Sequence, residues 1–211
     1  MNRTIDLLNA YCEQLSTPPS PVLQELERET HLKTLAPQMM SGHLQGHLLR
    51  LLCRLKQPQC ALEIGTFTAY ATICIAEGLP KDGQLHTIEA NPEMAYIIQK
   101  FIHKAGLEKR VQSHIGKAED IIPVLDQRFD FVFLDAGKLD YGMFYDLLIE
   151  QINPGGLILA DNVLWSGKVV QSTKDKDTAA LHAFNEKIKQ DPRVENIILP
   201  IRDGLLIAQK L

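Results

Sequence analysis

Three oxygen-bearing side chains stand at the ends of two apolar runs in the second half of the sequence. Asp135 ends the run FVFLD, and Asp161 and Asn162 end the run LILADN. If both runs are neighbouring parallel strands, these side chains project from one edge of a sheet. Such oxygens are the ligands that a hard divalent cation prefers, so we predict a site for Mg²⁺, with Mn²⁺ or Ca²⁺ as alternatives. The competing interpretation is that both aspartates cap the helices that follow.

Lys138 follows Asp135 by three residues and is the candidate general base. Most lysines are solvated, and that interpretation stays open for this one. Beside a bound cation, however, a lysine loses its proton more readily and can then accept the proton of a reacting hydroxyl.

The first half of the sequence contains a second group of polar strand ends. Glu63 lies among apolar neighbours that predict a buried strand, where a carboxylate needs a cationic or hydrogen-bonding partner. In the loop that begins at Gly65, Phe67 and Tyr70 stand where a dinucleotide fingerprint has glycines. Glu89 follows Gly65 by 24 residues, which is about the interval expected for an acid that meets ribose hydroxyls. The pattern favours a nucleoside without a pyrophosphate.

Other clusters are less informative. The closest histidines, His43 and His47, have no obvious third ligand and lack the full H-E-x-x-H signature. The four cysteines match no C-x-x-C or zinc spacing and are interpreted as reduced structural thiols: Cys12, Cys53, Cys60 and Cys74.

The elements that must position these groups alternate from Cys60 onward. Short apolar runs separated by single helical stretches predict a parallel sheet that is covered on both faces. The last two runs, ENIILPI and GLLIAQK, are joined by too few residues for a crossover and must be antiparallel. Residues 1–57 predict three helices, with a break at 17–21. We therefore expect one α/β domain, 1–211, with an N-terminal helical segment (1–57) and a doubly wound seven-stranded core (58–211).

Charge and hydropathy exclude several classes of partner. The 211 residues contain 22 Lys and Arg against 26 Asp and Glu, a net charge of -4, which attracts neither nucleic acid nor an anionic membrane. Asp6 and Glu13 interrupt the region where a signal peptide needs an apolar core, and no run reaches membrane-spanning length. We expect a cytoplasmic protein.

Five motifs together resemble one family. They are LEIGTFTAYATICIAEGLP, LHTIEANPE, FDFVFLDAGKLDY, PGGLILADNVLWSGKVV and DPRVENIILPIRDGLLIAQK. In this order they are similar to the cation-dependent O-methyltransferases, which include the catechol and caffeoyl-coenzyme A enzymes, from about residue 22 to the C-terminus. The resemblance implies the Rossmann-like S-adenosylmethionine fold with strand order 3-2-1-4-5-7-6 and strand 7 antiparallel.

The resemblance also implies roles for individual residues. S-adenosylmethionine would be held by Ser41, Glu63, Gly65, Thr66, Glu89, Ala118 and Asp135, with Glu89 at the ribose and Ala118 at the adenine. Asp135 would also serve the cation and the acceptor. The family usually has Gly-Tyr-Ser where this chain has Ala69-Tyr70-Ala71, so the serine that meets the methionine carboxylate is absent. Thr66, Thr68 and Ser41 are open alternatives for that contact.

The acceptor is expected to be a small vicinal dihydroxy aromatic molecule. By the resemblance, Trp165 and Ser166 border the acceptor, and Trp165 either forms an aromatic wall or packs in the protein. By the resemblance, Ile197 and Gly137 stand at positions where the catechol and caffeoyl enzymes carry other residues. We therefore do not expect this chain to copy either enzyme closely.

Two other functions compete with methyl transfer. One is a noncatalytic S-adenosylmethionine-binding protein that docks a polypeptide through the N-terminal helices. The other is a nicotinamide-dependent reductase, which Phe67 and Tyr70 disfavour.

The N-terminal helices carry more apolar residues than one sheet face can cover. The family commonly forms dimers, and we expect a two-fold homodimer built on these leucines: Leu7, Leu8, Leu15, Leu44, Leu48, Leu51 and Leu52.

Overall fold

The computed structural model describes residues 3–172 and 174–211, and its centre is a seven-stranded sheet. The strand order is β3-β2-β1-β4-β5-β7-β6, as expected. The strands are β1 (Cys60–Ile64), β2 (Gln84–Glu89), β3 (Val111–Ile115), β4 (Phe129–Leu134), β5 (Ile152–Ala160), β6 (Val194–Leu199) and β7 (Leu205–Lys210). Strands β1 to β5 pair in parallel, whereas β7 runs antiparallel to both β5 and β6. The prediction of a terminal antiparallel hairpin is confirmed.

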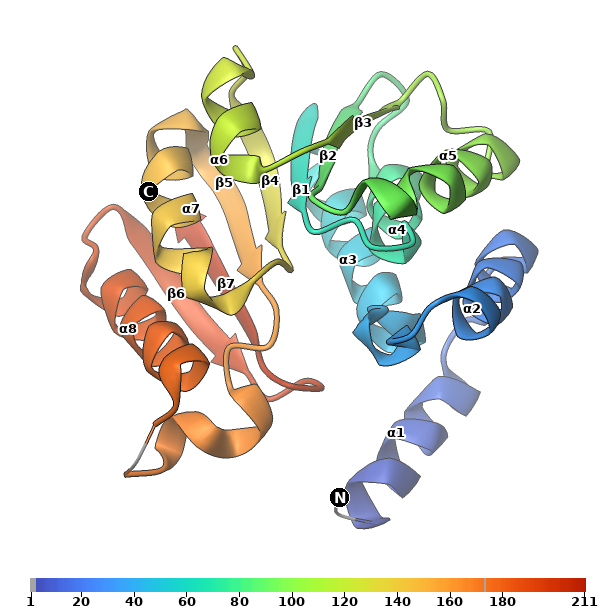
Figure 1. Cartoon of the computed structure of the whole chain (residues 1–211). Coiled ribbons are helices and arrows are strands. Elements are labelled where there is room, and N and C mark those ends of the chain that lie inside the picture. Colours follow the sequence, from blue (N-terminus) through green and yellow to red (C-terminus); the bar gives the residue numbers. More distant parts are fainter. Residues whose placement is uncertain (1–2, 173) are drawn as a thin grey trace.

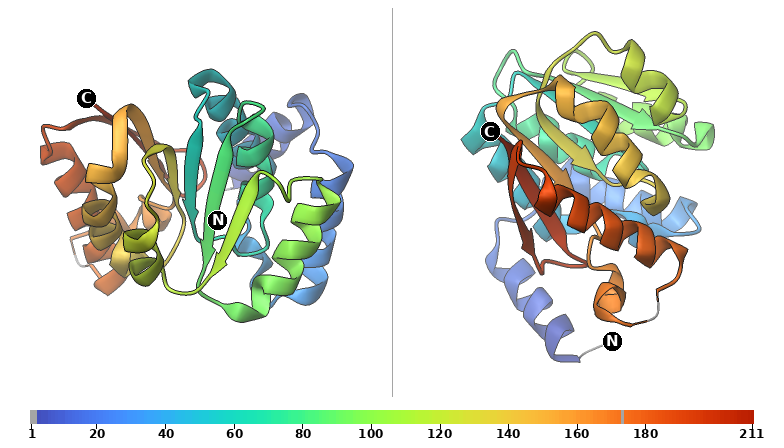
Figure 2. Two further views of the ribbon diagram at one scale, coloured as in Figure 1. Left: turned by 90° about the horizontal axis from the view of Figure 1, so that it is seen from above. Right: turned by 90° about the vertical axis from the view of Figure 1, so that its left-hand side faces the viewer.

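Helices cover both faces of the sheet (Figure 1 and Figure 2, left). One face carries α2 (Pro21–Lys33), α3 (Gly42–Lys56), α4 (Tyr70–Gly78) and α5 (Ala95–Lys104). The other carries α6 (Ala118–Ile121), α7 (Tyr141–Leu148) and α8 (Lys176–Gln190). Short 3-10 turns cover Pro37–Met39, Pro92–Met94, Ile122–Val124, Lys138–Asp140, Ile149–Gln151 and Trp165–Val170. Helix α1 (Arg3–Leu15) stands away from this body in Figure 1 and in the right-hand view of Figure 2.

The central strands are buried on both sides, which explains their continuous apolar runs. In β4, Phe131 and Phe133 pack against the α3–α5 face, while Val132 and Leu134 pack against the α6–α8 face. Side-chain caps mark the start of α2 and of α8. Ser20 accepts the Leu23 N–H at the start of α2, and Asp175 accepts the Thr178 N–H at the start of α8. Three helices precede the sheet, with the break where it was predicted.

The ends of β1 and β4 touch through their backbones. Gly65 has a φ of +97°, and a Cβ at this position would lie 1.9 Å from the carbonyl oxygen of Asp135. The Gly65 N–H donates to the Ile88 carbonyl over 2.9 Å, and the Asp135 N–H donates to the Ile64 carbonyl over 2.8 Å. Only glycine satisfies both the positive φ and the close approach, so this residue ties three strand ends together.

Two glycine-to-alanine substitutions should therefore have opposite effects. Gly65→Ala should lower the free energy of unfolding by at least about 2 kcal/mol, because the new methyl group cannot avoid the Asp135 carbonyl and the φ is strained. Gly142 lies in α7, and no atom lies within 4 Å of the place that an added methyl group would take, so Gly142→Ala should be neutral or stabilising by up to about 1 kcal/mol. Urea unfolding of both variants measures the difference. A loss below about 0.5 kcal/mol for Gly65→Ala would disprove the close approach.

Candidate functional site

A cleft of about 890 Å³ opens at the carboxyl ends of β1, β2, β4 and β5. This is the edge where ligands bind in open α/β sheets, at the point where the strand order reverses between β1 and β4. Most of the residues singled out from the sequence line it: Gly65, Glu89, Ala118, Asp135, Lys138, Asp161, Asn162 and Trp165.

Glu89 is held in place by backbone amides at the end of β2. Its Oε2 accepts the Phe67 N–H over 2.7 Å, and its Oε1 accepts the Asn91 N–H over 2.8 Å. Phe67 has a φ of +50°, a left-handed conformation at the start of the loop after β1. Each carboxylate oxygen keeps a lone pair, so Glu89 can accept two further hydrogen bonds from hydroxyls in the cleft.

A small cavity of about 10 Å³ adjoins the cleft and shares Gly65, Phe67 and Asp135 with it. Ser41, Thr66 and Thr68 line this cavity. All three are buried, and they were the alternatives for the contact that Ala71 cannot make. Their hydrogen bonds now distinguish them.

The hydroxyl proton of Thr66 is already committed, whereas that of Thr68 is not. Thr87 donates to Glu63, so the 2.5 Å contact between Thr66 and Thr87 uses the Thr66 proton. The Thr30 hydroxyl lies 2.8 Å from the Leu26 carbonyl and donates to the Thr68 hydroxyl over 3.0 Å, so Thr68 accepts in this contact and its own proton is not used there. The Ser41 side chain makes no helix-capping bond. Ser41 and Thr68 are therefore the two lining hydroxyls whose protons remain available to a ligand.

Glu63 lies beneath the floor of the site and lines neither cavity. Its side chain is fully buried, and its Oε2 accepts hydrogen bonds from Thr72 over 2.5 Å and from Thr87 over 2.6 Å. Among the described residues, Oε1 has no partner. Burial raises the pKa of Glu63 to about 8, against the smaller lowering by the two threonines. The hydrogen-bonding partner that the sequence predicted for Glu63 is therefore a pair of threonine hydroxyls. The hydrogen bonds from Thr72 through Glu63 and Thr87 to Thr66 hold the loop after β1 in place.

Asp135 and Asp161 face the cleft from the ends of adjacent strands. Their side chains are 17% and 2% exposed. Burial raises the pKa of Asp135 to about 6; the Lys138 ammonium lowers it, and Asp161 raises it again. Neither aspartate accepts a capping hydrogen bond from a following helix, because the residues that precede those helical turns are Gly137 and Leu164. The capping interpretation is therefore wrong.

Asn162 supplies the third oxygen-bearing side chain at this edge. Its φ is +59°, a left-handed conformation that asparagine tolerates, and its N–H donates to the Asp161 Oδ1 over 2.8 Å. In the part of the chain that the structure describes, no three His, Cys, Asp or Glu side chains gather as a metal cage. A cation at this edge would thus be held by two carboxylates and the Asn162 amide oxygen.

Lys138 lies between Asp135 and a tyrosine that sequence reasoning missed. Its Nζ is 3.2 Å from the Asp135 Oδ1 and donates to the Tyr141 hydroxyl over 2.8 Å. The Tyr141 hydroxyl in turn lies 3.2 Å from the Leu134 carbonyl and 3.1 Å from the Asp161 carbonyl. Tyr141 therefore orients the lysine above both strand ends. The available signal was its position three residues after Lys138, one helical turn along the chain.

The turn between β6 and β7 was also missed, although Arg202 and Asp203 line the cleft. Asp203 accepts the backbone N–H of Ser166. Ser166 itself does not line the cleft, so its contribution is this backbone contact. Trp165 is half-buried, lines the cleft and also packs against the core, so it stays a candidate for the aromatic wall.

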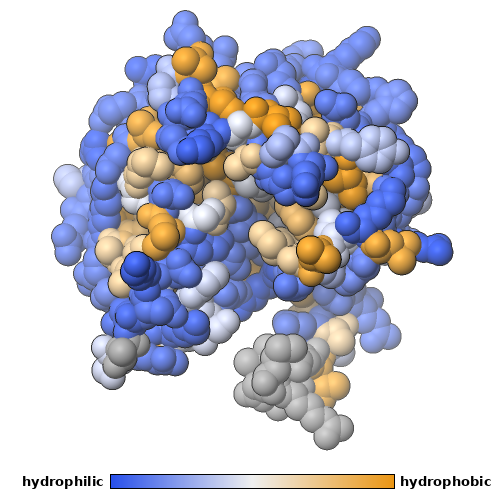
Figure 3. Space-filling model, in the orientation of Figure 1, coloured by the Kyte–Doolittle hydropathy of each residue, from blue (hydrophilic) through white to orange (hydrophobic). Residues whose placement is uncertain are grey.

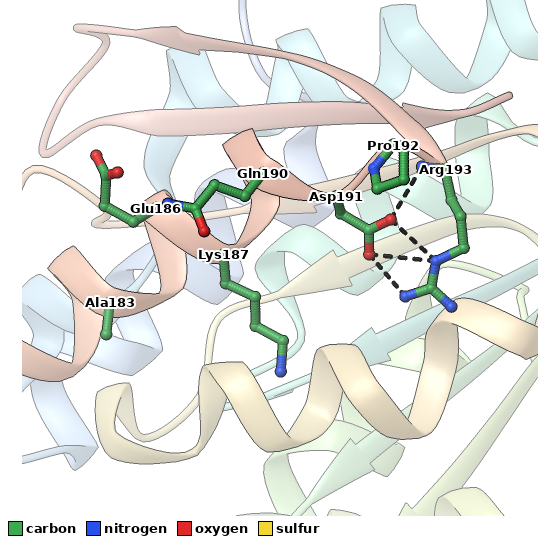
Figure 4. Close-up of a pocket in the computed structure, with 7 residues that line it drawn as sticks. All are labelled: Ala183, Glu186, Lys187, Gln190, Asp191, Pro192 and Arg193. Atoms are coloured by element: carbon green, nitrogen blue, oxygen red, sulfur yellow. Dashed lines mark hydrogen bonds and ion pairs between the residues drawn. The ribbon is translucent and has the colours of Figure 1, made fainter.

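A second, shallow depression lies at the end of α8 and differs in kind (Figure 4). Its charged groups are already paired. Arg193 makes an ion pair with Asp191 over 2.6 Å, and Asp191 also accepts the Tyr145 hydroxyl over 2.8 Å. Such paired surface charges do not indicate a ligand site.

The fold and the site define a class of protein, a Rossmann-like methyltransferase, and comparisons with known proteins identify the family. The sequence pattern described as "O-methyltransferase" matches residues 13–211. A catechol O-methyltransferase from Niastella koreensis is 37% identical, with 78% of this chain and 79% of that protein aligned. Caffeoyl-CoA O-methyltransferase 2 from Populus trichocarpa is 31% identical over 98% of this chain and 89% of its own length.

Two solved methyltransferase structures have the same fold as this chain. The SAH-bound methyltransferase PaMTH1 from Podospora anserina superposes with a TM-score of 0.92 at 28% identity, covering 100% of this chain and 97% of that one. TomG from Streptomyces achromogenes, solved in complex with SAM, has a TM-score of 0.90 at 30% identity, covering 100% and 99%. The chain belongs to the O-methyltransferase family, as the motifs indicated. None of its described helices has the length and apolar character needed to cross a membrane.

Proposed function

We propose that this chain transfers the methyl group of S-adenosylmethionine to one hydroxyl of a small vicinal dihydroxy aromatic molecule, with the help of a divalent cation. The observation that carries the proposal is the position of Asp135. It lines the small cavity on one side and the cleft beside Lys138 and Asp161 on the other.

The residues present fit the cofactor. S-adenosylmethionine supplies an electrophilic methyl group on a sulfonium and carries no pyrophosphate. Glu89, with both oxygens fixed by amides, would accept the ribose hydroxyls. Ala118 is buried, lines the cleft at the start of α6 and leaves room for the adenine. Ser41, Gly65 and Thr66 would border the methionine end from the small cavity, which has room for one water-sized group, while the methionine chain itself would lie in the cleft; Glu63 would act through its hydrogen-bonded threonines.

The residues also fit a divalent cation. Asp135 and Asp161 face one cleft from adjacent strands, and the negative charge of Asp161 raises the pKa of Asp135 although Lys138 and Arg202 lie beside them, so a divalent cation would relieve the remaining repulsion. A bound cation would hold both acceptor oxygens and make the reacting hydroxyl more acidic. The Asn162 amide would complete the protein's contribution.

Lys138 is placed to accept the acceptor's proton once a cation bound beside it has made its ammonium give up its own proton. Tyr141 and Asp135 fix its Nζ in the cleft, and the lysine side chain is only 11% exposed. Holding the hydroxyl beside this base and in line with the methyl group is the protein's main catalytic contribution, since positioning can supply up to about 7–11 kcal/mol. A protein that only bound the cofactor would have no use for this arrangement.

The charges around the cleft favour a small acceptor over a coenzyme A thioester. Seven carboxylates and three cationic side chains line it. Lys138 is paired with Asp135, Lys117 lies 3.9 Å from Glu119, and Arg202 is bonded to the N-terminal segment. Phosphate groups would thus meet no unengaged cation among the described lining residues. Trp165 and Phe144, which also line the cleft, suit a planar ring.

Transfer of a labelled methyl group tests this function. We expect catechol to be methylated with Mg²⁺, activity to vanish with a chelator, and caffeoyl-coenzyme A to give at least tenfold lower kcat/KM than catechol. Asp161→Ala should lose the activity but keep its affinity for S-adenosylhomocysteine. Chelator-resistant activity would contradict the cation, and equal kcat/KM for the thioester would contradict the small acceptor.

Lys138→Ala should lower kcat by roughly 10²–10⁴, the usual range for a general base, while cofactor binding stays nearly unchanged. Raising the pH should partly restore the rate, because the hydroxyl can then lose its proton to solvent. Lys138→Arg should stay inactive at neutral pH, since a guanidinium keeps its proton. Lys117→Ala is the matched control, because Lys117 also lines the cleft but is 72% exposed. A kcat for Lys138→Ala within about threefold of wild type would remove the lysine from the mechanism.

We also propose that the chain forms a two-fold homodimer through α1 and α3. Leu7, Leu8 and Leu15 on the projecting helix are 57–67% exposed, and Leu55 on α3 is 81% exposed. Apolar side chains are visible on this helix in Figure 3. Leu48 and Leu52, by contrast, pack against the chain's own core and contribute less than expected. An apolar surface of this kind favours a self-complementary partner.

Sedimentation at micromolar concentration should give a dimer. Leu8→Glu should convert it to a monomer, because the charge would be buried between the subunits. Val124→Glu is the control, since Val124 is 77% exposed on a different part of the surface. A monomeric wild-type chain would refute the proposal.

A further inference from the structure

The turn between β6 and β7 borders the cleft and is held in place by the loop after β5. We call this turn the platform. The Val163 N–H donates to the Gly204 carbonyl over 3.1 Å, and the Leu164 N–H donates to the Asp203 carbonyl over 2.9 Å. A Cβ on Gly204 would lie 2.3 Å from the Leu164 side chain, so the turn packs directly on the loop after β5. Within this turn Arg202 has a φ of +51°, a strained conformation for a residue other than glycine.

From this platform the Arg202 side chain reaches the N-terminal segment. One guanidinium nitrogen donates to the Ser41 carbonyl and, over 2.7 Å, to the Gln45 side chain. The other donates to the Met40 carbonyl over 3.2 Å. Gln45 is 1% exposed, so this is an interior contact. On its other side, the guanidinium lies 4.0 Å from Asp161.

The segment held by Arg202 forms a wall of both cavities. Met39 lines the cleft and the small cavity, and Met40 and Ser41 line the small cavity. The backbone bonds described for residues 37–40 are local, from Met39 to Ala36 and from Met40 to Pro37. Local bonds shape the segment but do not fix its distance from the sheet. Met40 also packs in the core, and the contacts from Arg202 add a polar tie between this segment and the turn between β6 and β7.

We propose that Arg202 is a positioning residue for the cofactor: it holds residues 40–45 against the sheet so that the Ser41 hydroxyl faces the methionine end. This inference rests on the proposed cofactor. It assigns Arg202 to cofactor binding, because its hydrogen bonds go to backbone and amide oxygens of residues 40–45, whereas its ion pair with Asp161 is longer, at 4.0 Å. A planar guanidinium spans several acceptors at once, which a lysine ammonium cannot do in the same geometry.

The sharpest variant is Arg202→Gly. Glycine adopts the positive φ of this position without strain, so the turn keeps its shape while the side chain is removed. The control is Arg110→Ala. Arg110 also donates to two carbonyls, those of Leu79 over 3.1 Å and Pro80 over 2.9 Å, and does not line the cleft.

Calorimetric titration with S-adenosylhomocysteine and hydrogen–deuterium exchange should be measured on both variants and on wild type. For Arg202→Gly we expect at least fivefold weaker binding, faster exchange of residues 40–45 and a KM for S-adenosylmethionine that rises by a larger factor than kcat falls. Gln45→Ala should weaken binding less, and adding it to Arg202→Gly should have little further effect, since the two residues act through one contact. For Arg110→Ala we expect a dissociation constant within twofold of wild type.

Two results would overturn the inference. One is an Arg202→Gly dissociation constant within twofold of wild type, whatever the exchange rates. The other is equal weakening in Arg110→Ala, which would mean that loss of general stability explains the effect. Failure of wild type to bind S-adenosylhomocysteine would instead refute the proposed function, so the two failures are distinguishable.

Discussion

The backbone contact between Gly65 and Asp135 is the constraint on which the site depends. A side chain at position 65 would lie 1.9 Å from the Asp135 carbonyl, so the loops after β1 and β4 can meet only because the first begins with glycine. The order of the strands reverses between these two, and their crossover connections therefore diverge and leave a crevice above them. Asp135 stands in that crevice and borders both cavities. One short contact thus brings the cofactor side and the cation side of the cleft together.

Acidic groups are distributed unequally around this contact. Glu63 is enclosed in the floor, where burial raises its pKa to about 8 and favours the uncharged acid at neutral pH. Asp135 and Asp161 face the cleft, and the nearby cationic groups are Lys138 and Arg202. An uncharged Glu63 does not add a third negative charge beneath Asp135 and Asp161. The surplus of carboxylates in the cleft is what a divalent cation would balance.

The sequence predicted those parts of the site that follow from strand topology. Asp135, Asp161, Asn162 and Glu89 end apolar runs, and parallel strands bring such ends to one edge. It could not predict contacts that depend on how distant turns pack. Arg202 meets Gln45 across 157 positions, and nothing in the residues around either one indicates the other. Ser166 does not line the cleft and has a φ of +53°, a conformation that local sequence determines weakly. The capping interpretation failed for a related reason, since the helical turns begin later than the strand ends suggested.

The central claim is that Asp135 serves both halves of the site. Calorimetric titration of Asp135→Ala with S-adenosylhomocysteine and, separately, with Mn²⁺ tests it most directly, with circular dichroism to confirm that the variant is folded. The account predicts that both affinities fall at least fivefold, because the carboxylate borders both cavities. A variant that bound S-adenosylhomocysteine as tightly as wild type while losing only Mn²⁺ would contradict the account.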